Sequence, residues 1–525
     1  DSISERFIWK SNIGHVILSL SGQERRKVLK QWSKKINILG ELLLFLFFFI
    51  FYSRIVPIVP FDSDDWTYMG YYRIPLPIWG DWNPSRVLPE ILMPNLSILA
   101  GRVLYPLTGN YIGAMTTAYA LFMAALLVIL CVELYRFMAS QGASKVQSVL
   151  LTFLWALLHF SLLAGANTGN GLLWGSLTAT CYFYYSIPAL WNEALVLYLM
   201  RTKGQKKSVL VKILLYILCY FGVFSNLFPA VILSAYAGMD IICAFVEWVQ
   251  ADKMERKSFF KRLGVELLNV YVIVLFFVSA VFELSGGRAS GFSGFQFAMV
   301  METLKGVFAT FNPLSLASIT VLLLYSVVSI CSKRGKTLYK DEVTTILLEL
   351  GAFFIVLVFN ILLCARTGAW YIKREDVLVE IIFFALLVVF TLASYACDKA
   401  ESVKIPYMIF GIALALNLLV FGNFSHDFYK TGYSGTISVE KCIQVDEDIV
   451  QQVTTAVKEN KSRLDLRVPD FGSSDNWPLA TYAGGPYSRF AYTLWRHGLI
   501  KKGINITVVP DKAKNAEFGI VDHLD

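Results

Sequence analysis

Charged residues are scarce in this chain. Asp, Glu, Lys and Arg make up only 16% of its 525 residues, whereas soluble domains usually contain about 25%. Hydrophobic residues account for 56% of the sequence, and several apolar runs reach ~18–24 residues, which is enough to cross a bilayer. The low charge therefore excludes an ordinary soluble globular protein and predicts an α-helical polytopic membrane protein.

Histidine is scarcer still, and several catalytic motifs are missing. The sequence contains five scattered histidines, His15, His159, His426, His497 and His523. It has no GxxxxGK[ST] phosphate loop, no GxSxG nucleophile elbow and no HExxH pair. These absences argue against a His-based metal site, a catalytic triad and an ATP-driven pump.

The eight cysteines and the net charge also exclude functions. Seven cysteines lie in or beside apolar runs, where they behave as small hydrophobic residues, and only Cys442 lies in a polar region. This distribution predicts no disulfide framework. The net charge of +8 comes from basic residues dispersed among short loops, which is not the pattern of a nucleic-acid-binding surface.

Basic residues indicate on which side of the membrane each loop lies. Six of them precede the first apolar run, between Arg25 and Lys35, so residues 1–37 are predicted to be cytoplasmic or interfacial. That run is too long for a signal peptide and is predicted to remain as a span. Placing successive loops alternately inside and outside then gives about eleven spans, with the N-terminus inside and the C-terminus outside. The spans lie at about 38–59, 109–135, 146–165, 172–200, 209–224, 227–248, 264–284, 313–331, 343–364, 377–396 and 405–422.

Two regions outside the predicted spans are long. The first outer loop, 60–108, contains Pro-interrupted apolar stretches that predict short helices on the outer membrane face. Residues 423–525 have ordinary polar periodicity, with helices predicted at DEDIVQQVTTAVKEN and PYSRFAYTLWRHG and strands at LDLRVP and INITVVP. The sequence therefore predicts a transmembrane domain over 38–422 and a small extracytoplasmic α/β domain over 423–525.

Three carboxylates stand where the first span leaves the membrane. The segment FDSDDW places Asp62, Asp64 and Asp65 at the membrane mouth, where charge is costly unless it has a function. The alternative is a solvated loop with an interfacial aromatic belt. A carboxylate here could act as the general base for a hydroxyl that attacks the anomeric carbon of a sugar.

The outer loops also supply positive charge and aromatic faces. Arginine is the best partner for a departing phosphate, and each basic residue here has the alternative of anchoring at the interface. The phosphate-binding candidates are Arg366, Arg374, Lys373, Arg288 and Arg86. The candidates for binding the sugar or the acceptor are Trp66, Tyr68, Trp82 and Glu90. Together they suit a polyprenyl-phosphate donor with its lipid tail between spans.

These motifs, in this order, resemble a known family. The pattern is FDSDDW, WGDWNPSRVLPE, a run of spans, RTGAWYIKRE and a tail containing DLRVPDFGSSDNWP and GINITVVPD. It is similar to the bacterial serotype-converting glucosyltransferases and polysaccharide side-chain transferases, which are membrane glycosyltransferases of the GT-C type. One departure concerns Ser85–Arg86, which stands where that family often has Gly-Arg, and it leaves the role of Arg86 open.

The resemblance implies an enzyme of the bacterial cytoplasmic membrane. It would transfer one hexose, often glucose, from polyprenyl phosphate to a surface polysaccharide or lipid-linked glycan, with inversion. It places the base among Asp62, Asp64 and Asp65, favours the adjacent Asp64–Asp65 pair and leaves the choice between these two open. We expect no metal, although clustered carboxylates could hold a divalent cation. The rival functions are a secondary transporter or flippase of lipid-linked or soluble sugars and a glycan polymerase or ligase.

Overall fold

The computed structural model describes most of the chain. The described residues are 22–60, 62–71, 84–163, 172–176, 178–250, 267–285, 294–332, 338–399, 404–422, 437–470, 477–485, 488–501 and 504–520. The predicted N-terminal segment 1–37 therefore lies largely outside them, and only its end, from Gly22, belongs to a described helix.

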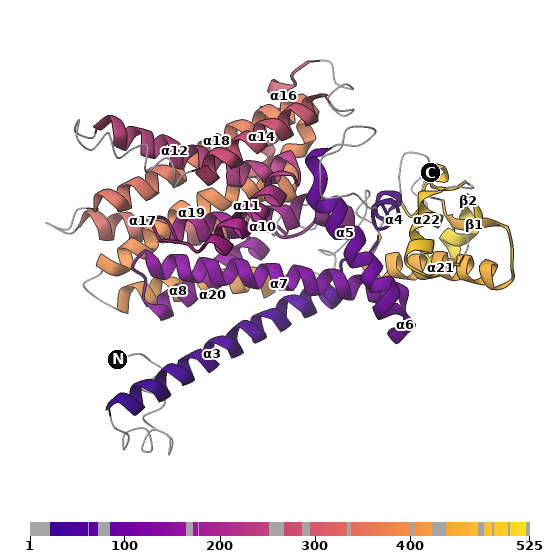
Figure 1. Cartoon of the computed structure of the whole chain (residues 1–525), viewed down its shortest axis with the longest axis horizontal. Helices are drawn as coiled ribbons and strands as arrows, with labels where there is room; N and C mark the ends of the chain where they lie inside the picture. The colour runs from indigo at the N-terminus through magenta and orange to yellow at the C-terminus, as the bar shows by residue number, and fades with distance from the viewer. Residues whose placement is uncertain are drawn as a thin grey trace.

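Long helices form a bundle, and a smaller group of helices and strands lies at one end of it (Figure 1). The bundle helices are α3 (Gly22–Ile50), α7 (Tyr111–Ser140), α8 (Lys145–Ser161), α10 (Ile187–Arg201), α11 (Val209–Val223), α12 (Leu227–Gln250), α14 (Leu267–Ser285), α17 (Pro313–Cys331), α18 (Lys340–Thr367), α19 (Glu375–Lys399) and α20 (Lys404–Gly422). The short helix α16 (Phe297–Phe308) precedes α17. The start of α3 and the C-terminal elements lie at opposite ends of the molecule (Figure 1).

Eight helical segments within the described residues are long and apolar enough to cross a membrane. They are Asn37–Ile55, Val87–Thr108, Tyr111–Ser140, Leu227–Val249, Pro313–Cys331, Lys340–Thr367, Glu375–Asp398 and Lys404–Gly422, and α8, α11 and Leu267–Glu283 are shorter apolar helices. The chain is therefore a helical, membrane-embedded protein. The number of eleven spans stays a prediction, because seven of the eight segments coincide with predicted spans and the eighth does not.

That eighth segment, Val87–Thr108, falls in the predicted outer loop. It comprises α5 (Val87–Leu99), the π-helix η3 (Ala100–Leu104) and α6 (Tyr105–Thr108). Figure 1 shows α5 running obliquely to the bundle, next to the C-terminal elements. A side chain at Gly101 would meet the backbone of His497, whose carbonyl oxygen would lie 2.9 Å from the new Cβ. This segment thus packs against the C-terminal elements at the end of the bundle.

The predicted span 172–200 is not one continuous helix. After a turn come α9 (Ala179–Cys181), the π-helix η4 (Tyr182–Ser186) and α10. Pro188 is the reason for the irregular turn, because proline has no N–H to donate to the carbonyl four residues earlier. The π-helix η4 carries Tyr184 and Tyr185, which contact the candidate site described below.

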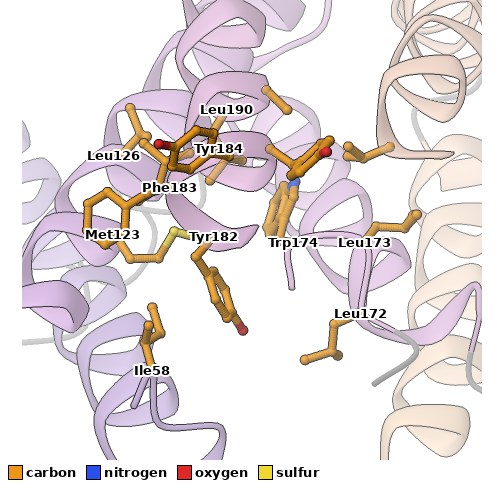
Figure 2. Packing of buried hydrophobic residues seen from close by; sticks show 14 of the residues in the cluster. Ile58, Met123, Leu126, Leu172, Leu173, Trp174, Tyr182, Phe183, Tyr184 and Leu190 are labelled. Carbon is orange, nitrogen blue, oxygen red and sulfur yellow. The ribbon is translucent and has the colours of Figure 1, made fainter. Parts of the chain in front are cut away.

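The core beneath η4 is apolar and aromatic. Trp174, Phe183 and Met123 are all at most 1% exposed. Figure 2 shows Phe183 pointing toward Met123 and Leu126 of α7, while Trp174 lies on the other side of η4. Burial of these large side chains fixes η4 against α7, at about 25 cal/mol for each Å² removed from solvent.

Contacts join helix ends that the predicted topology places on the same side. At one end, the Asn312 amide donates to the Leu162 carbonyl at 2.8 Å. At the other end, Arg201 and Glu133 form an ion pair at 2.7 Å. Each contact thus joins two helix ends that the predicted topology places together, and the side of the membrane stays a prediction.

The C-terminal elements include two parallel strands. Strand β1 (Arg463–Pro469) pairs with β2 (Asn505–Asp511) in a register that runs from Arg463↔Asn505 to Pro469↔Asp511. The helices are α21 (Val439–Lys458), α22 (Arg489–Arg496) and α23 (Lys512–Phe518). Both predicted strands and both predicted helices are confirmed, and α22 ends just before Gly498, which has φ of +81°. The side of the membrane on which these elements lie stays a prediction.

Candidate functional site

The short helix α4 (Ser63–Tyr68) carries the three carboxylates of the FDSDDW segment. Asp62 is the N-cap, and its Oδ1 accepts from the backbone N–H of Asp64 at 3.0 Å and of Asp65 at 3.2 Å. A capping carboxylate also stabilises the positive end of the helix. Asp62 is 1% exposed, and its two hydrogen bonds hold the first turn of α4 in place.

Asp65 is fully buried and bonded to a second helix. Its carboxylate accepts from the Ala179 N–H at 3.2 Å and the Thr180 N–H at 2.6 Å. These amides belong to the first turn of α9, whose N–H groups have no partner within the helix. Asp65 thus ties α4 to α9 and through it to η4.

Asp64 differs from its two neighbours because its side chain is exposed. Tyr482 of the C-terminal region lies beside it. Burial raises the pKa of Tyr482, and the negative charge of Asp64 raises it further. Asp64 is therefore the carboxylate of the three that an external substrate can reach.

The predicted sugar-binding residues occupy different surroundings. Trp66 is fully buried, stacked on Tyr111 and edge-on to Phe490, so its ring faces contact protein. Tyr68 is partly buried and lies edge-on to the Tyr184 ring, with the centroids 5.3 Å apart. Trp82 lies outside the described residues.

Glu90 is buried in α5 and faces η4. Its Oε1 accepts from the Tyr184 hydroxyl at 3.1 Å. Tyr184 therefore contacts both Tyr68 of α4 and Glu90 of α5. The ring forms a bridge between the carboxylate helix and the cationic hollow described next.

Two of the predicted phosphate-binding arginines line one hollow. Arg86 and Arg366 line a small hollow together with Glu283, with a cavity volume of about 50 Å³. The other lining residues are mainly apolar or aromatic: Tyr185, Asn226, Leu227, Phe228, Leu363, Thr367 and Tyr371. The hollow lies at the end of α18 and the beginning of α12, where bundle helices meet their connecting segments.

Arg86 is held by a carboxylate. Its Nε and Nη2 donate to Glu283 Oε1 at 3.0 and 2.9 Å, and its guanidinium lies 5.8 Å from the Tyr184 ring centroid. Burial lowers the pKa of Arg86, but the Glu283 charge and hydrogen bond, together with Tyr184 and Tyr185, outweigh it and the pKa is raised. Arg86 therefore stays a fixed cation at the wall of the hollow.

Arg374 lies next to this hollow. Its guanidinium pairs with Asp376 at 2.6 Å and covers the rings of Tyr185 and Tyr371, at 4.5 and 5.3 Å from their centroids. Burial lowers its pKa, but Asp376 raises it well above the usual range. Lys373 is exposed, and Arg288 lies outside the described residues.

The C-terminal elements dock directly on α4. Thr493 Oγ1 donates to the Trp66 carbonyl at 2.7 Å, and Arg496 donates to the Gly70 carbonyl at 2.9 Å. His497 contacts the Met69 carbonyl through Nε2 at 3.0 Å. Docking of α22 thus fixes the C-terminal end of α4, and α4 is the helix that carries Asp64.

A fourth carboxyl group, on α21, lies near the same helix. Asp446 is 1% exposed. Burial raises its pKa well above the usual range, and the negative charges of Asp65, Glu447 and Asp62 add to the shift. No group of three or more His, Cys, Asp or Glu side chains within the described residues is arranged to hold a metal ion.

Sequence reasoning did not assign several residues that build the site. Glu283, Tyr184 and Tyr185 each belong to a predicted span, where nothing in the pattern distinguishes a site residue from a packing residue. An acidic residue at the outer end of a span was the available signal for Glu283.

Comparison with known proteins gives no relative. No family model, no curated protein and no solved structure matches the chain.

Proposed function

We propose that this protein is a membrane glycosyltransferase that transfers a hexose from a polyprenyl-phosphate donor to a glycan acceptor at the outer membrane face. The observation that carries the proposal is the hollow with Arg86 and Arg366 in an aromatic and apolar wall. Cations at a membrane-helix end, beside apolar surface, suit a lipid that carries a phosphate.

The charge of the hollow favours one class of phosphate. Two arginines and one glutamate line it, so its formal charge is +2 − 1 = +1. A polyprenyl-phosphate hexose is a phosphodiester with a single negative charge, whereas a pyrophosphate diester carries two. The hollow therefore suits the monophosphate donor better than the pyrophosphate donor of a polymerase or ligase.

Asp64 is the proposed general base. It would accept the proton of the acceptor hydroxyl while that oxygen forms the new bond to the anomeric carbon. The bond between the anomeric carbon and the phosphate oxygen breaks, and the polyprenyl phosphate leaves with inversion at carbon. Arg366 and Arg86 would stabilise the charge on the leaving phosphate. Asp62 and Asp65 support Asp64 through the contacts of α4.

The test uses the purified full-length chain with polyprenyl-phosphate glucose and release of polyprenyl phosphate as the readout. We expect Asp64→Asn to lower the rate about 10²–10⁴-fold, as for loss of a general base. Arg366→Gln should lower it by about 10²-fold or more. Lys305→Gln is the matched control, because Lys305 is exposed on α16 and does not line the hollow. Full activity in both site variants would refute the proposal.

A sugar-lipid transporter is the second candidate function, and buried carboxyl groups favour it. Glu193, Glu349 and Glu380 are fully buried within the bundle, and buried acids of this kind occur in transport pathways. In sealed vesicles, movement of the labelled donor across the membrane without release of polyprenyl phosphate would support transport. Release of polyprenyl phosphate that depends on Asp64 would support transfer.

A further inference from the structure

A second hollow lies where the first span, α7 and α21 meet. Its cavity volume is about 320 Å³, at the lower end of the range of about 300–1,000 Å³ that is typical of ligand sites. Its walls include Phe49, Arg54, Asn110, Thr117, Ile443 and Glu447. None of the residues proposed above for hexose transfer lines this hollow.

The position of the hollow suits an amphiphile. Phe49 and Arg54 belong to the candidate span Asn37–Ile55, whose Ile50 and Ile55 are 50% and 43% exposed. Exposed apolar side chains on a span face lipid tails, and an arginine at the end of a span reaches the headgroup level. The hollow therefore extends from the apolar zone of the span to the polar surface of α21.

Two opposite charges line the hollow. Arg54 and Glu447 are both exposed. Glu447 Oε1 accepts from Asn110 Nδ2 at 3.2 Å, and Asn110 Oδ1 accepts from the Gly113 N–H at 2.7 Å. The N-cap of α7 therefore holds the Glu447 carboxylate in a defined position.

A ligand that complements this wall needs an anionic and a cationic group on one headgroup. A phosphodiester suits the arginine through charge-assisted hydrogen bonds, and an ammonium group suits the carboxylate by attraction of opposite charges. A neutral sugar would leave both charges without a charged partner.

We infer that the second hollow binds the headgroup of a zwitterionic aminophospholipid, with its phosphodiester at Arg54 and its primary ammonium at Glu447. The bound lipid joins α21 of the C-terminal region to the first span. The inference does not depend on the proposed hexose transfer.

The test uses the full-length protein in nanodiscs with equal amounts of phosphatidylethanolamine, phosphatidylglycerol and phosphatidylcholine. Native mass spectrometry after transfer to detergent counts the lipids that stay bound. We expect the wild type to retain phosphatidylethanolamine in preference to phosphatidylcholine, whose methylated ammonium cannot donate hydrogen bonds.

Two variants separate the two contacts. Arg54→Gln should lower retention of all three lipids about tenfold, because the phosphodiester loses its charged partner, and Arg54→Lys should restore part of it. Glu447→Gln should abolish the preference for phosphatidylethanolamine and leave phosphatidylglycerol retention unchanged. Lys305→Gln, on an exposed helix elsewhere, should behave as wild type.

Three results would overturn the inference. They are unchanged lipid retention in Arg54→Gln, equal retention of phosphatidylethanolamine and phosphatidylcholine by the wild type, and displacement of the lipid by a soluble oligosaccharide acceptor. The last result would identify the hollow as a glycan site.

Discussion

Asp65 accepts two backbone hydrogen bonds from α9, whereas the Asp64 side chain beside it is exposed. The two carboxylates are adjacent in sequence and point to different surroundings, because successive side chains of a helix are about 100° apart. Substitution at each should therefore affect a different property of the protein.

We predict that Asp65→Asn lowers the stability of the folded protein. Asparagine has one carboxamide oxygen where aspartate has two, and its NH₂ group would face an α9 amide that also donates. A lost buried hydrogen bond of this kind costs about 1–3 kcal/mol. Thermal unfolding in detergent measures the change, and Asp64→Asn is the matched control, with an expected midpoint close to that of the wild type. Equal midpoints for the wild type and Asp65→Asn would contradict the prediction.

His497 gives a prediction about pH. Burial lowers its pKa to about 4, and the positive charges of Arg496 and Arg102 contribute, although the bond to the Met69 carbonyl opposes them. In the unfolded chain the pKa is about 6.5. Between these values the unfolded chain binds more protons, so this contribution to stability is present above about pH 6.5 and is lost as the pH falls toward 4.

We therefore expect the wild type to lose more stability than His497→Gln when the pH falls from 7.5 to 5. The measurement is the difference in unfolding midpoint between the two pH values for each protein. The remaining titratable groups are the same in both proteins, so their contributions to the pH dependence cancel in the comparison. A variant with the same pH dependence as the wild type would show that His497 is not responsible.

At the scale of elements, the contact between α4 and α22 depends on close approach of the two backbones. Gly70 follows α4, and a Cβ there would overlap Thr493 Oγ1 and lie 2.6 Å from Thr493 Cα. An added Cβ at Gly101 of η3 would lie 2.6 Å from the Cβ of His497. Glycine is required at both positions because the obstacles are backbone or Cβ atoms that cannot move independently.

We predict that Gly70→Ala separates the C-terminal elements from α4 and that Gly101→Ala separates them from η3. Limited proteolysis should then cut between residues 437 and 520 at least several times faster than in the wild type. Gly40→Ala is the control, because no atom lies within 4 Å of its added Cβ and alanine is favourable in a helix. Unchanged proteolysis in both variants would mean that the elements stay docked despite the overlap.

At the scale of the whole molecule, the exposed apolar side chains indicate which surfaces of the bundle face lipid. Exposed apolar side chains such as Leu210 at 76% and Phe277 at 64% face the surroundings of the bundle, as expected for contact with lipid. The C-terminal elements and the start of α3 lie at opposite ends (Figure 1), which agrees with the proposed sides.

Cysteine labelling in intact cells tests these sides. In a Cys331→Ser background, which removes an exposed native thiol, a cysteine at Glu459 should react with a membrane-impermeant maleimide. A cysteine at Gln205 should react only after the membrane is permeabilised. Both native residues are exposed, so the thiols differ in the side of the membrane and not in burial. The reverse labelling pattern would invert the topology.

The sequence alone determined the membrane class and most of the helices. Long apolar runs leave the backbone no alternative to helix within a bilayer, so the run at 343–364 predicted α18 (Lys340–Thr367). The local patterns of the C-terminal region likewise predicted both strands, because alternation and turn residues act over a few positions. The break at Pro188 has a local signal too, which the long apolar stretch obscured.

The tertiary structure decided which of the conspicuous residues have which surroundings. Sequence reasoning could not separate Asp64 from Asp65, because their difference arises from α9, more than a hundred residues away in the chain. In the same way it could not pair Arg86 with Glu283, or give Tyr184 contacts to both Arg86 and Glu90. Local pattern specifies elements through backbone hydrogen bonding, whereas a site is assembled by packing between distant segments, and only the folded chain fixes those contacts.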